Sequence, residues 1–485
     1  MSGTFPAKQD IKWYLHVLII FLLMFGFPHL PPFGDLTSAG MQVVGIFLGL
    51  MYGWSLVSIM WPSLLGFLAL AFSDVSSMKE MLVASFSNDT FMFLIFMFAF
   101  LTLIEESGVS QFFASWTVSR KILQGRPWLF SFILLVSCYF VSSFISVFAA
   151  IFVFWSIIYN VAKRADYEPY SPYPTIMIMG VIVVAGMSTI TLPFKGGAVF
   201  LVNAYNAMSG FNIDFIKYIA YTIPTTIFLL GVYILACRFI LRIDISALKE
   251  CIDPSLVNPE DLKLSAYQKI ILSLLLLMLF MLMGPSILPK SLILTQILRE
   301  LGMTGTMIVL VILTLIVRYN QKPLMDFNRC AAKNVKWDTL IIVAVIIPVA
   351  TLMSADSTGI KTFLANLISP LLAGHSPIFF IILLVVCAGL FTNICNNGVV
   401  ALILISVLLS VGEELGLAPT PIAITIMLTV QMAMVTPAAS PFAAILFGNT
   451  EWIKPKDVYK YGSILLIFLL IGMIFCSIVW NNILY

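Results

Sequence analysis

A cluster of polar side chains lies inside a long uncharged stretch of the chain. The segment Phe391-Thr-Asn-Ile-Cys-Asn-Asn-Gly-Val-Val400 contains three asparagines, a threonine and a glycine. It belongs to a run of 51 residues, from Thr362 to Gly412, without Asp, Glu, Lys or Arg. Unpaired amides are costly in hydrocarbon, so such a cluster is expected to line a cavity or to bind a ligand. Amides both donate and accept, and they therefore suit a carboxylate or a cation.

The length of this run predicts that the chain turns back inside the membrane. A single helix of this length would extend about 75 Å, far beyond a hydrocarbon core of ~30 Å. Pro377 is suited to begin one arm, and Asn396-Asn-Gly398 to break the chain before a second arm. We expect a re-entrant helical hairpin over 376–411 with a polar tip.

An earlier stretch repeats this design. Pro127–Ala162 is a run of 36 uncharged residues with serines in its middle, among them Ser146. The spacing from Pro127 to Ser146 equals that from Pro377 to Asn396, and the two stretches are offset by about half of the 485 residues. Such an offset is typical of the internal duplications of transporters. A first re-entrant hairpin is therefore expected over 127–162.

Each half also contains a hydrophobic stretch that polar residues and proline interrupt. The first contains Ser188-Thr-Ile-Thr-Leu-Pro-Phe-Lys195, and the second contains Thr436-Pro-Ala-Ala-Ser-Pro-Phe442. We expect two broken helices, over 173–205 and 419–448.

The composition predicts a polytopic helical membrane protein. Hydrophobic residues make up 61%, charged residues 10%, and the mean hydropathy is +1.05, which lies far from the average of soluble domains. The seven cysteines show no CxxC spacing and are interpreted as packing residues. Trp13–Phe27 lacks a small-residue cleavage site and is expected to be a retained transmembrane helix. The chain shows no nucleic-acid-binding pattern, and its three histidines lie outside any HExxH motif, which argues against an enzyme.

The hydrophobic pattern predicts an all-α fold with about eleven transmembrane helices plus the two hairpins. The crossings are expected at 12–28, 38–55, 57–73, 90–106, 173–205, 218–240, 268–287, 304–318, 338–354, 419–448 and 462–482. With a cytoplasmic N-terminus and an external C-terminus, 20 Lys and Arg lie inside and 5 outside, with Lys195 at membrane depth, as the positive-inside rule requires. Basic flanks place the entry of the first hairpin on the cytoplasmic side, whereas Glu413-Glu414 places that of the second outside. Segment 243–264 is expected to be a cytoplasmic connector, either on the membrane surface or as a polar linker.

The order of hairpin, interrupted helix and span, present twice, resembles the divalent anion:sodium symporters of dicarboxylates and citrate. These belong to the ion transporter superfamily, and each of their hairpin tips carries Ser-Asn-Thr. Here Phe144-Ile-Ser-Val-Phe148 and Cys395-Asn-Asn-Gly398 occupy the tips. Ser440–Gly448 is similar to the second Gly-Thr-Pro-Pro-Asn-like stretch of the family, and Ile453–Gly462 fits the approach to its last helix.

The resemblance implies a secondary transporter that carries a small organic anion, such as a di- or tricarboxylate, by alternating access. It implies an elevator-type inverted repeat in a homodimer in the cell membrane, in contact with lipid. Scaffold helices would lie in 1–120 and 268–370, and the transport domain in 127–242 and 376–485. An inorganic oxyanion or another small solute is the alternative, because the tips depart from the family pattern.

The departures lie mainly in the first half. Val147 and Phe148 stand where the family has the tip asparagine and threonine, and Lys195 stands where it has the asparagine of the broken helix. The second tip retains Asn397. A lysine at this depth is expected to grip an anion or to replace a cation, although a lysine near an interface also snorkels to the surface.

Two sets of site residues follow from these motifs. The substrate is expected to contact Ser146, Thr189, Lys195, Asn396, Asn397, Gly398 and Ser440. A cation site, for sodium or a proton as coupling ion and with no other cofactor, is expected at Thr392, Asn393, Asn397 and Thr436. Two alternatives remain for the amides: hydrogen bonding between helices, and bracing of the second tip from behind by Thr392 and Asn393.

Overall fold

The chain folds into an almost wholly helical protein. The structure, a computed structural model, describes residues 8–87, 89–249, 262–372, 376–412, 415–437 and 439–484. Within these residues the only strands are the short antiparallel pair β1 (Arg318–Tyr319) and β2 (Lys322–Pro323). The predicted fold class, an all-α polytopic membrane protein, is confirmed.

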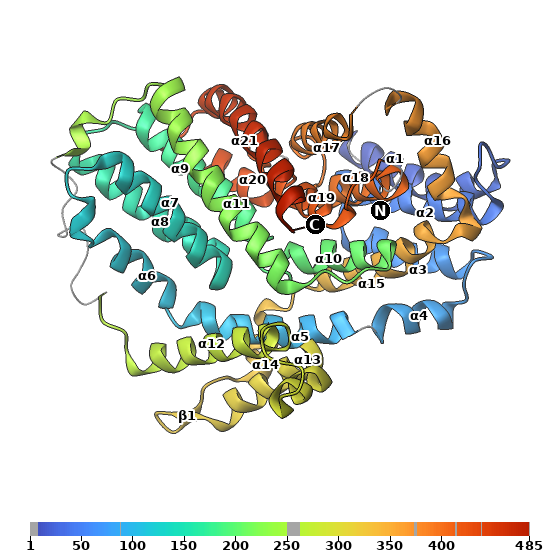
Figure 1. The fold of residues 1–485 in the computed structure, drawn as a ribbon, viewed down its shortest axis with the longest axis horizontal. Helices are drawn as coiled ribbons and strands as arrows, with labels where there is room; N and C mark the ends of the chain where they lie inside the picture. Colours follow the sequence, from blue (N-terminus) through green and yellow to red (C-terminus); the bar gives the residue numbers. More distant parts are fainter. Residues whose placement is uncertain are drawn as a thin grey trace, which may run out of the picture.

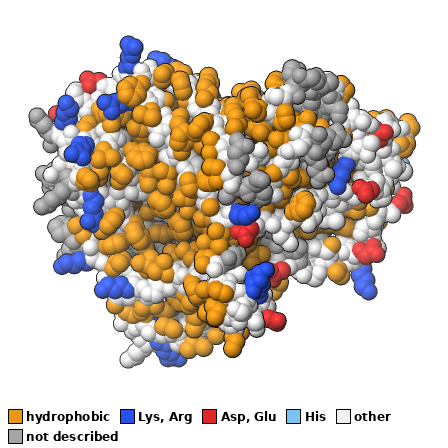
Figure 2. Space-filling view, in the orientation of Figure 1, with side chains coloured by type: hydrophobic (Ala, Val, Ile, Leu, Met, Phe, Trp, Pro, Cys, Tyr) orange, Lys and Arg blue, Asp and Glu red, His pale blue; other side chains and the backbone are white. Residues whose placement is uncertain are grey.

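Nine of the described helical segments are long and apolar enough to cross a membrane. They are Ile11–His29, which includes most of α1 (Lys8–Phe21), α2 (Ser38–Leu56), α7 (Pro127–Phe144), α8 (Val147–Arg164), α11 (Phe215–Leu235), α12 (Ala266–Ile287), α13 (Ile293–Ile316), α15 (Trp337–Ser354) and α21 (Pro455–Leu484). Two further helices, α4 (Met78–Phe86) and α5 (Asp89–Glu106), are bent by 46° relative to each other. Hydrophobic side chains gather over the left and central part of the face shown in Figure 2, as expected for a surface in contact with lipid.

The predicted broken segments consist of pairs of shorter helices. The stretch 173–205 is divided into α9 (Pro172–Ser188) and α10 (Gly197–Ser209), and 419–448 into α19 (Pro419–Thr429) and α20 (Pro441–Gly448). We call the connecting residues 189–196 and 430–440 the first and second break. Helices α9, α19 and α20 have a proline in the first turn, where its fixed φ and missing N–H are tolerated.

Both predicted hairpins consist of two helices joined by a short turn. Helices α7 and α8 meet at Ile145 and Ser146, and α17 (Pro377–Phe391) and α18 (Asn397–Val411) are joined by residues 392–396. Pro127 and Pro377 begin the first arms, while Ser146 and Asn396 cap the second arms. Each pair is separated by 250 positions. We call residues of the two hairpins that are related by this interval paired positions.

The remaining helices were not predicted as separate elements. They are α3 (Met60–Ala71), which lies within a predicted span, and α6 (Val109–Val118), α14 (Phe327–Asn334) and α16 (Ile360–Leu372). Helix α14 is held to the end of α5 because Arg329 and Lys333 both pair with Glu106 at 2.7 Å. Most of the connector 243–264, and Glu413-Glu414, lie outside the described residues.

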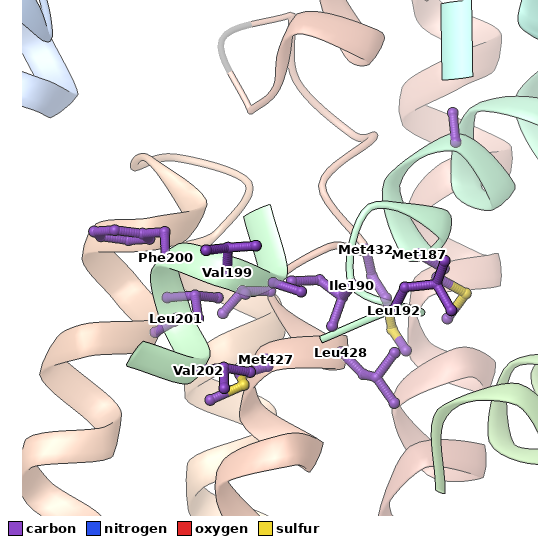
Figure 3. Close-up of a cluster of buried hydrophobic side chains, with 14 of the residues drawn as sticks. Met187, Ile190, Leu192, Val199, Phe200, Leu201, Val202, Met427, Leu428 and Met432 are labelled. Atoms are coloured by element: carbon purple, nitrogen blue, oxygen red, sulfur yellow. The ribbon is translucent and has the colours of Figure 1, made fainter. Parts of the chain in front are cut away.

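The hairpins pack against the broken helices. In Figure 1, α7, α8 and α9 lie together on the left, and α21 runs between them and the α17–α19 region. Helix α9 contacts α7, α8, α20 and α21; α21 also contacts α11, α17 and α19; and α10 contacts α15 and α18. Figure 3 shows the apolar core between the breaks, where Met187, Ile190 and Leu192 lie close to Leu428 and Met432.

One glycine allows the two halves to approach closely. A Cβ on Gly186, near the end of α9, would lie 2.3 Å from the carbonyl oxygen of Gln431 in the second break. Backbone atoms can approach this closely only where the side chain is absent, as is common where membrane helices pack. The end of α9 therefore lies directly against the second break.

We expect Gly186→Ala to lower the free energy of unfolding by about 1–3 kcal/mol, because the second break must shift to admit the methyl group. The matched control is Gly231→Ala in α11, where the nearest atom to the added Cβ would lie 3.9 Å away. This control should be neutral or stabilising by up to ~1 kcal/mol. Thermal unfolding in detergent measures both, and an equal effect of the two substitutions would contradict the close approach.

Candidate functional site

Lys195 ties the first break to the first hairpin. Its Nζ donates hydrogen bonds to the carbonyl oxygens of Ser142 at 3.3 Å, Ser143 at 2.8 Å and Ile145 at 3.2 Å. These carbonyls lie at the end of α7, where a helix has no intrahelical donors left and carries a partial negative charge. The ammonium group therefore caps the C-terminus of α7 from another segment of the chain.

Hydroxyl groups add a second tie between the same elements. Thr191 of the first break accepts a hydrogen bond from Ser143 at 3.0 Å and donates one to Tyr139 at 2.8 Å. Thr222 of α11 donates to the carbonyl of Thr191, and Tyr218 to that of Ile190. Each buried carbonyl thus receives a donor, as an apolar interior requires.

Asn393 ties the second hairpin to the second break. Its Oδ1 accepts from the backbone N–H groups of Met434 at 3.1 Å and Val435 at 2.8 Å, and its Nδ2 donates to the carbonyl of Gly389 at 2.8 Å. The carbonyl of Asn393 in turn accepts from Thr436 Oγ1. The side chain is buried. This arrangement corresponds to the alternative in which Asn393 braces the second tip from behind.

Asn397 has a different environment from Asn393. Its Oδ1 accepts from Thr392 Oγ1 at 2.9 Å, and its Nδ2 lies 3.3 Å from Gln431 Oε1. Asn397 and Gln431 are both half-buried, whereas Thr392 is fully buried and also donates to the carbonyl of Val430. Two partly accessible amides therefore face each other at the second tip.

Three of the predicted substrate residues act as helix caps. The side-chain oxygens of Ser146, Asn396 and Ser440 accept from backbone N–H groups at the starts of α8, α18 and α20. This is the usual function of serine and asparagine at such positions. Thr189, by contrast, donates to the carbonyl of Gly186 at the end of α9.

The starts of four helices come together in two pairs that join the halves of the chain. At the start of α18, a Cβ on Gly398 would lie 2.9 Å from the ring of Phe200 in α10. At the start of α8, the ring of Phe148 lies 5.6 Å from that of Phe442 in α20. The N-terminus of a helix carries partial positive charge and attracts anions. Positive helix ends thus lie in two pairs, one at the starts of α10 and α18 and one at the starts of α8 and α20.

Two contributors to this region were not predicted from the sequence. Gln431, the partner of Asn397, could have been singled out as an uncharged amide inside the interrupted stretch 419–448. Lys336, at the start of α15, lies 5.7 Å above the ring of Phe148 and adds positive charge beside the first tip. No local motif indicates Lys336, since only the fold brings it to the hairpin.

Paired helical hairpins with broken helices, whose half-helix ends meet, are the architecture of secondary transporters. The family model described as "Sodium:sulfate symporter transmembrane region" matches residues 12–485, and the chain belongs to this family. The family is that of the divalent anion:sodium symporters, so the resemblance stated from the hairpin motifs is confirmed. The protein is thus an anion transporter of the multi-pass membrane type and not an enzyme.

Two solved structures share the fold. One is the transporter YdaH of Alcanivorax borkumensis, with a TM-score of 0.56, 12% identity, and 98% of each chain covered. The other is MtrF of Neisseria gonorrhoeae, with a TM-score of 0.56, 13% identity, and coverage of 99% of this chain and 96% of that one. Comparison with curated protein sequences finds no match.

We expect Asn393→Ala to lower the free energy of unfolding by on the order of 3 kcal/mol, because it leaves the N–H groups of buried Met434 and half-buried Val435 without an acceptor. The matched control is Asn366→Ala, which removes an exposed hydrogen bond to Asp35 and should cost less than ~1 kcal/mol. Thermal unfolding of the purified variants distinguishes the two cases. Equal melting temperatures would contradict a bracing function of Asn393.

Proposed function

We propose that the protein carries a small organic anion with two or three carboxylates across the cell membrane by alternating access. The observation that supports this most directly is the pairing of helix N-termini from the two halves, α10 with α18 and α8 with α20. Their partial positive charges favour a multiply charged anion without a full ion pair. The membership in a family of anion symporters agrees with this substrate class.

The site residues would divide the work between them. Asn397 and Gln431 present amide groups that can donate to a carboxylate. Ser146, Asn396 and Ser440 hold the helix ends in place, and Gly398 lets the start of α18 approach α10 closely. Lys195 would contribute positive charge to the site while its three bonds remain with the carbonyls of α7.

The movement would follow the elevator type in a homodimer. Residues 127–242 and 376–485 would form the moving transport domain, and 1–120 and 268–370 the scaffold. The dense packing of α9 with both α8 and α20, and of α21 with α17 and α19, supports the joint movement of the hairpins and broken helices.

Sodium is the coupling ion that the family implies, and the second half is suited to hold it. Thr392, Asn393, Asn397 and Thr436 bring carbonyl, amide and hydroxyl oxygens together. The carbonyl oxygens of Thr392 and Cys395 accept no hydrogen bond within the part of the chain that the structure describes. Free carbonyls at the end of a half-helix are typical sodium ligands in transporters, where the ion couples transport to its gradient.

Sulfate is the second candidate substrate, because the description of the family names it. Proteoliposomes preloaded with one solute, and tested with labelled dicarboxylates, tricarboxylates and sulfate, separate the two. Counterflow with carboxylates, and none with sulfate, supports the proposal, whereas counterflow with sulfate alone contradicts it. Counterflow with no solute of the panel would overturn both substrate classes.

We expect Asn397→Ala to lower the transport rate by at least about tenfold, because a lost hydrogen bond to a charged group costs about 1.5–3 kcal/mol. Folding should be little affected, since the side chain is only half-buried. Initial uptake in proteoliposomes and the melting temperature are measured together, with Asn366→Ala as the control. Unchanged uptake by a folded Asn397→Ala protein would contradict the site.

We expect a cytoplasmic N-terminus and an external C-terminus from the distribution of Lys and Arg. Lys322 in β2 and Lys361 in α16 are both exposed and would lie on opposite sides. In a background without reactive native cysteines, a membrane-impermeant maleimide should label Lys361→Cys in intact cells. Lys322→Cys should react only after permeabilisation, and the reverse pattern would contradict this orientation.

A further inference from the structure

The first and second breaks each direct one side chain to a carbonyl of the neighbouring hairpin tip. Lys195 lies seven residues after Ser188, which ends α9, and Thr436 lies seven residues after Thr429, which ends α19. Lys195 Nζ donates to the carbonyl of Ser143, and Thr436 Oγ1 donates to the carbonyl of Asn393. Ser143 and Asn393 are paired positions. The two side chains are therefore counterparts, one charged and one neutral.

The two tips also differ in whether their other carbonyl oxygens accept a hydrogen bond. Lys195 also bonds to the carbonyl oxygens of Ser142 and Ile145. Their paired positions are Thr392 and Cys395, whose carbonyl oxygens accept no hydrogen bond among the described residues. In the first half, three carbonyl oxygens thus accept hydrogen bonds from one ammonium group. In the second half, only one of the three paired carbonyl oxygens accepts a hydrogen bond among the described residues, and its donor is a hydroxyl group.

The first tip does not fit the sodium ion that the family implies. The carbonyl oxygens at the end of α7 already accept from a cation. Val147 stands at the position paired with Asn397, and its side chain has no oxygen to offer. A second cation beside the ammonium would also experience direct electrostatic repulsion. By the same criteria the second tip, with a neutral hydroxyl and free carbonyls, fits the ion.

From this difference we infer that Lys195 is a built-in cation that takes the place of sodium at the first tip. Sodium then binds only in the second half, at no more than one ion per chain. The inference rests on the proposed function for its sodium coupling. The positive charge of the Lys195 ammonium then partly balances the anion, which needs fewer ions to accompany it.

The test is the number of sodium ions that each purified protein binds in the absence of any anion. Equilibrium binding of radioactive sodium in detergent provides this number. The wild type should bind no more than one ion per chain. The double variant Val147→Asn/Lys195→Thr, which copies Asn397 and Thr436 into the first half, should bind one ion more than the wild type. The matched control Val147→Asn, which keeps Lys195, should bind the same number as the wild type.

Two or more ions on the wild type, or no additional ion on a folded double variant, would overturn the inference. If the double variant does not elute as a folded protein, Thr436→Lys supplies the reciprocal experiment, because it places an ammonium at the second tip. A wild type that binds one ion should lose it in this variant, and retention of the ion overturns the inference. A wild type that binds none contradicts the sodium site proposed for the second half but not the exclusion of sodium from the first tip. Since no anion is present, a failure of anion counterflow leaves this result unaffected.

Discussion

The structure depends on how the inner helix ends of two broken helices and two hairpins are satisfied in an apolar interior. A buried carbonyl or N–H without a partner costs about 1–3 kcal/mol, and each interrupted helix exposes several at once. The two breaks are filled by buried side chains such as Leu192, Phe194 and Met432, so water is not the general solution. Side chains from neighbouring segments must therefore supply the missing partners, and these ties hold each hairpin against its broken helix.

The two halves meet this constraint with opposite chemistry. In the first half, Lys195 extends from the break to the carbonyls of the hairpin. In the second half, Asn393 extends from the hairpin to the N–H groups of the break. A lysine satisfies acceptors and adds charge, whereas an amide satisfies donors and acceptors and adds none. The two tips consequently differ in charge, which is the property that decides what each tip can bind.

Much of this arrangement was predictable from the sequence because it follows from length and spacing. An uncharged run too long for one crossing must turn back, and the equal intervals from Pro127 to Ser146 and from Pro377 to Asn396 located both turns. The bracing geometry of Asn393 was not predictable, since its partners lie 41 and 42 positions away in the sequence. Helix α14 was missed for a related reason. It is short and polar, and it is fixed by Glu106, more than 200 positions away.

The geometry also distinguishes residues that hold the helix ends in place from residues whose side chains can bind a substrate. Ser146, Asn396 and Ser440 use their side-chain oxygens on the first turns of helices, so their residue types are explained by capping alone. Asn397 and Gln431 do not cap a helix with their side chains, because their amides bond mainly to other side chains. Replacing a hydrogen bond between two side chains with one to a ligand costs less free energy than breaking a capping bond, which would leave a backbone N–H group without an acceptor. Substrate selectivity should therefore depend on this amide pair and on the charge of Lys195, while the caps determine where the helix ends meet.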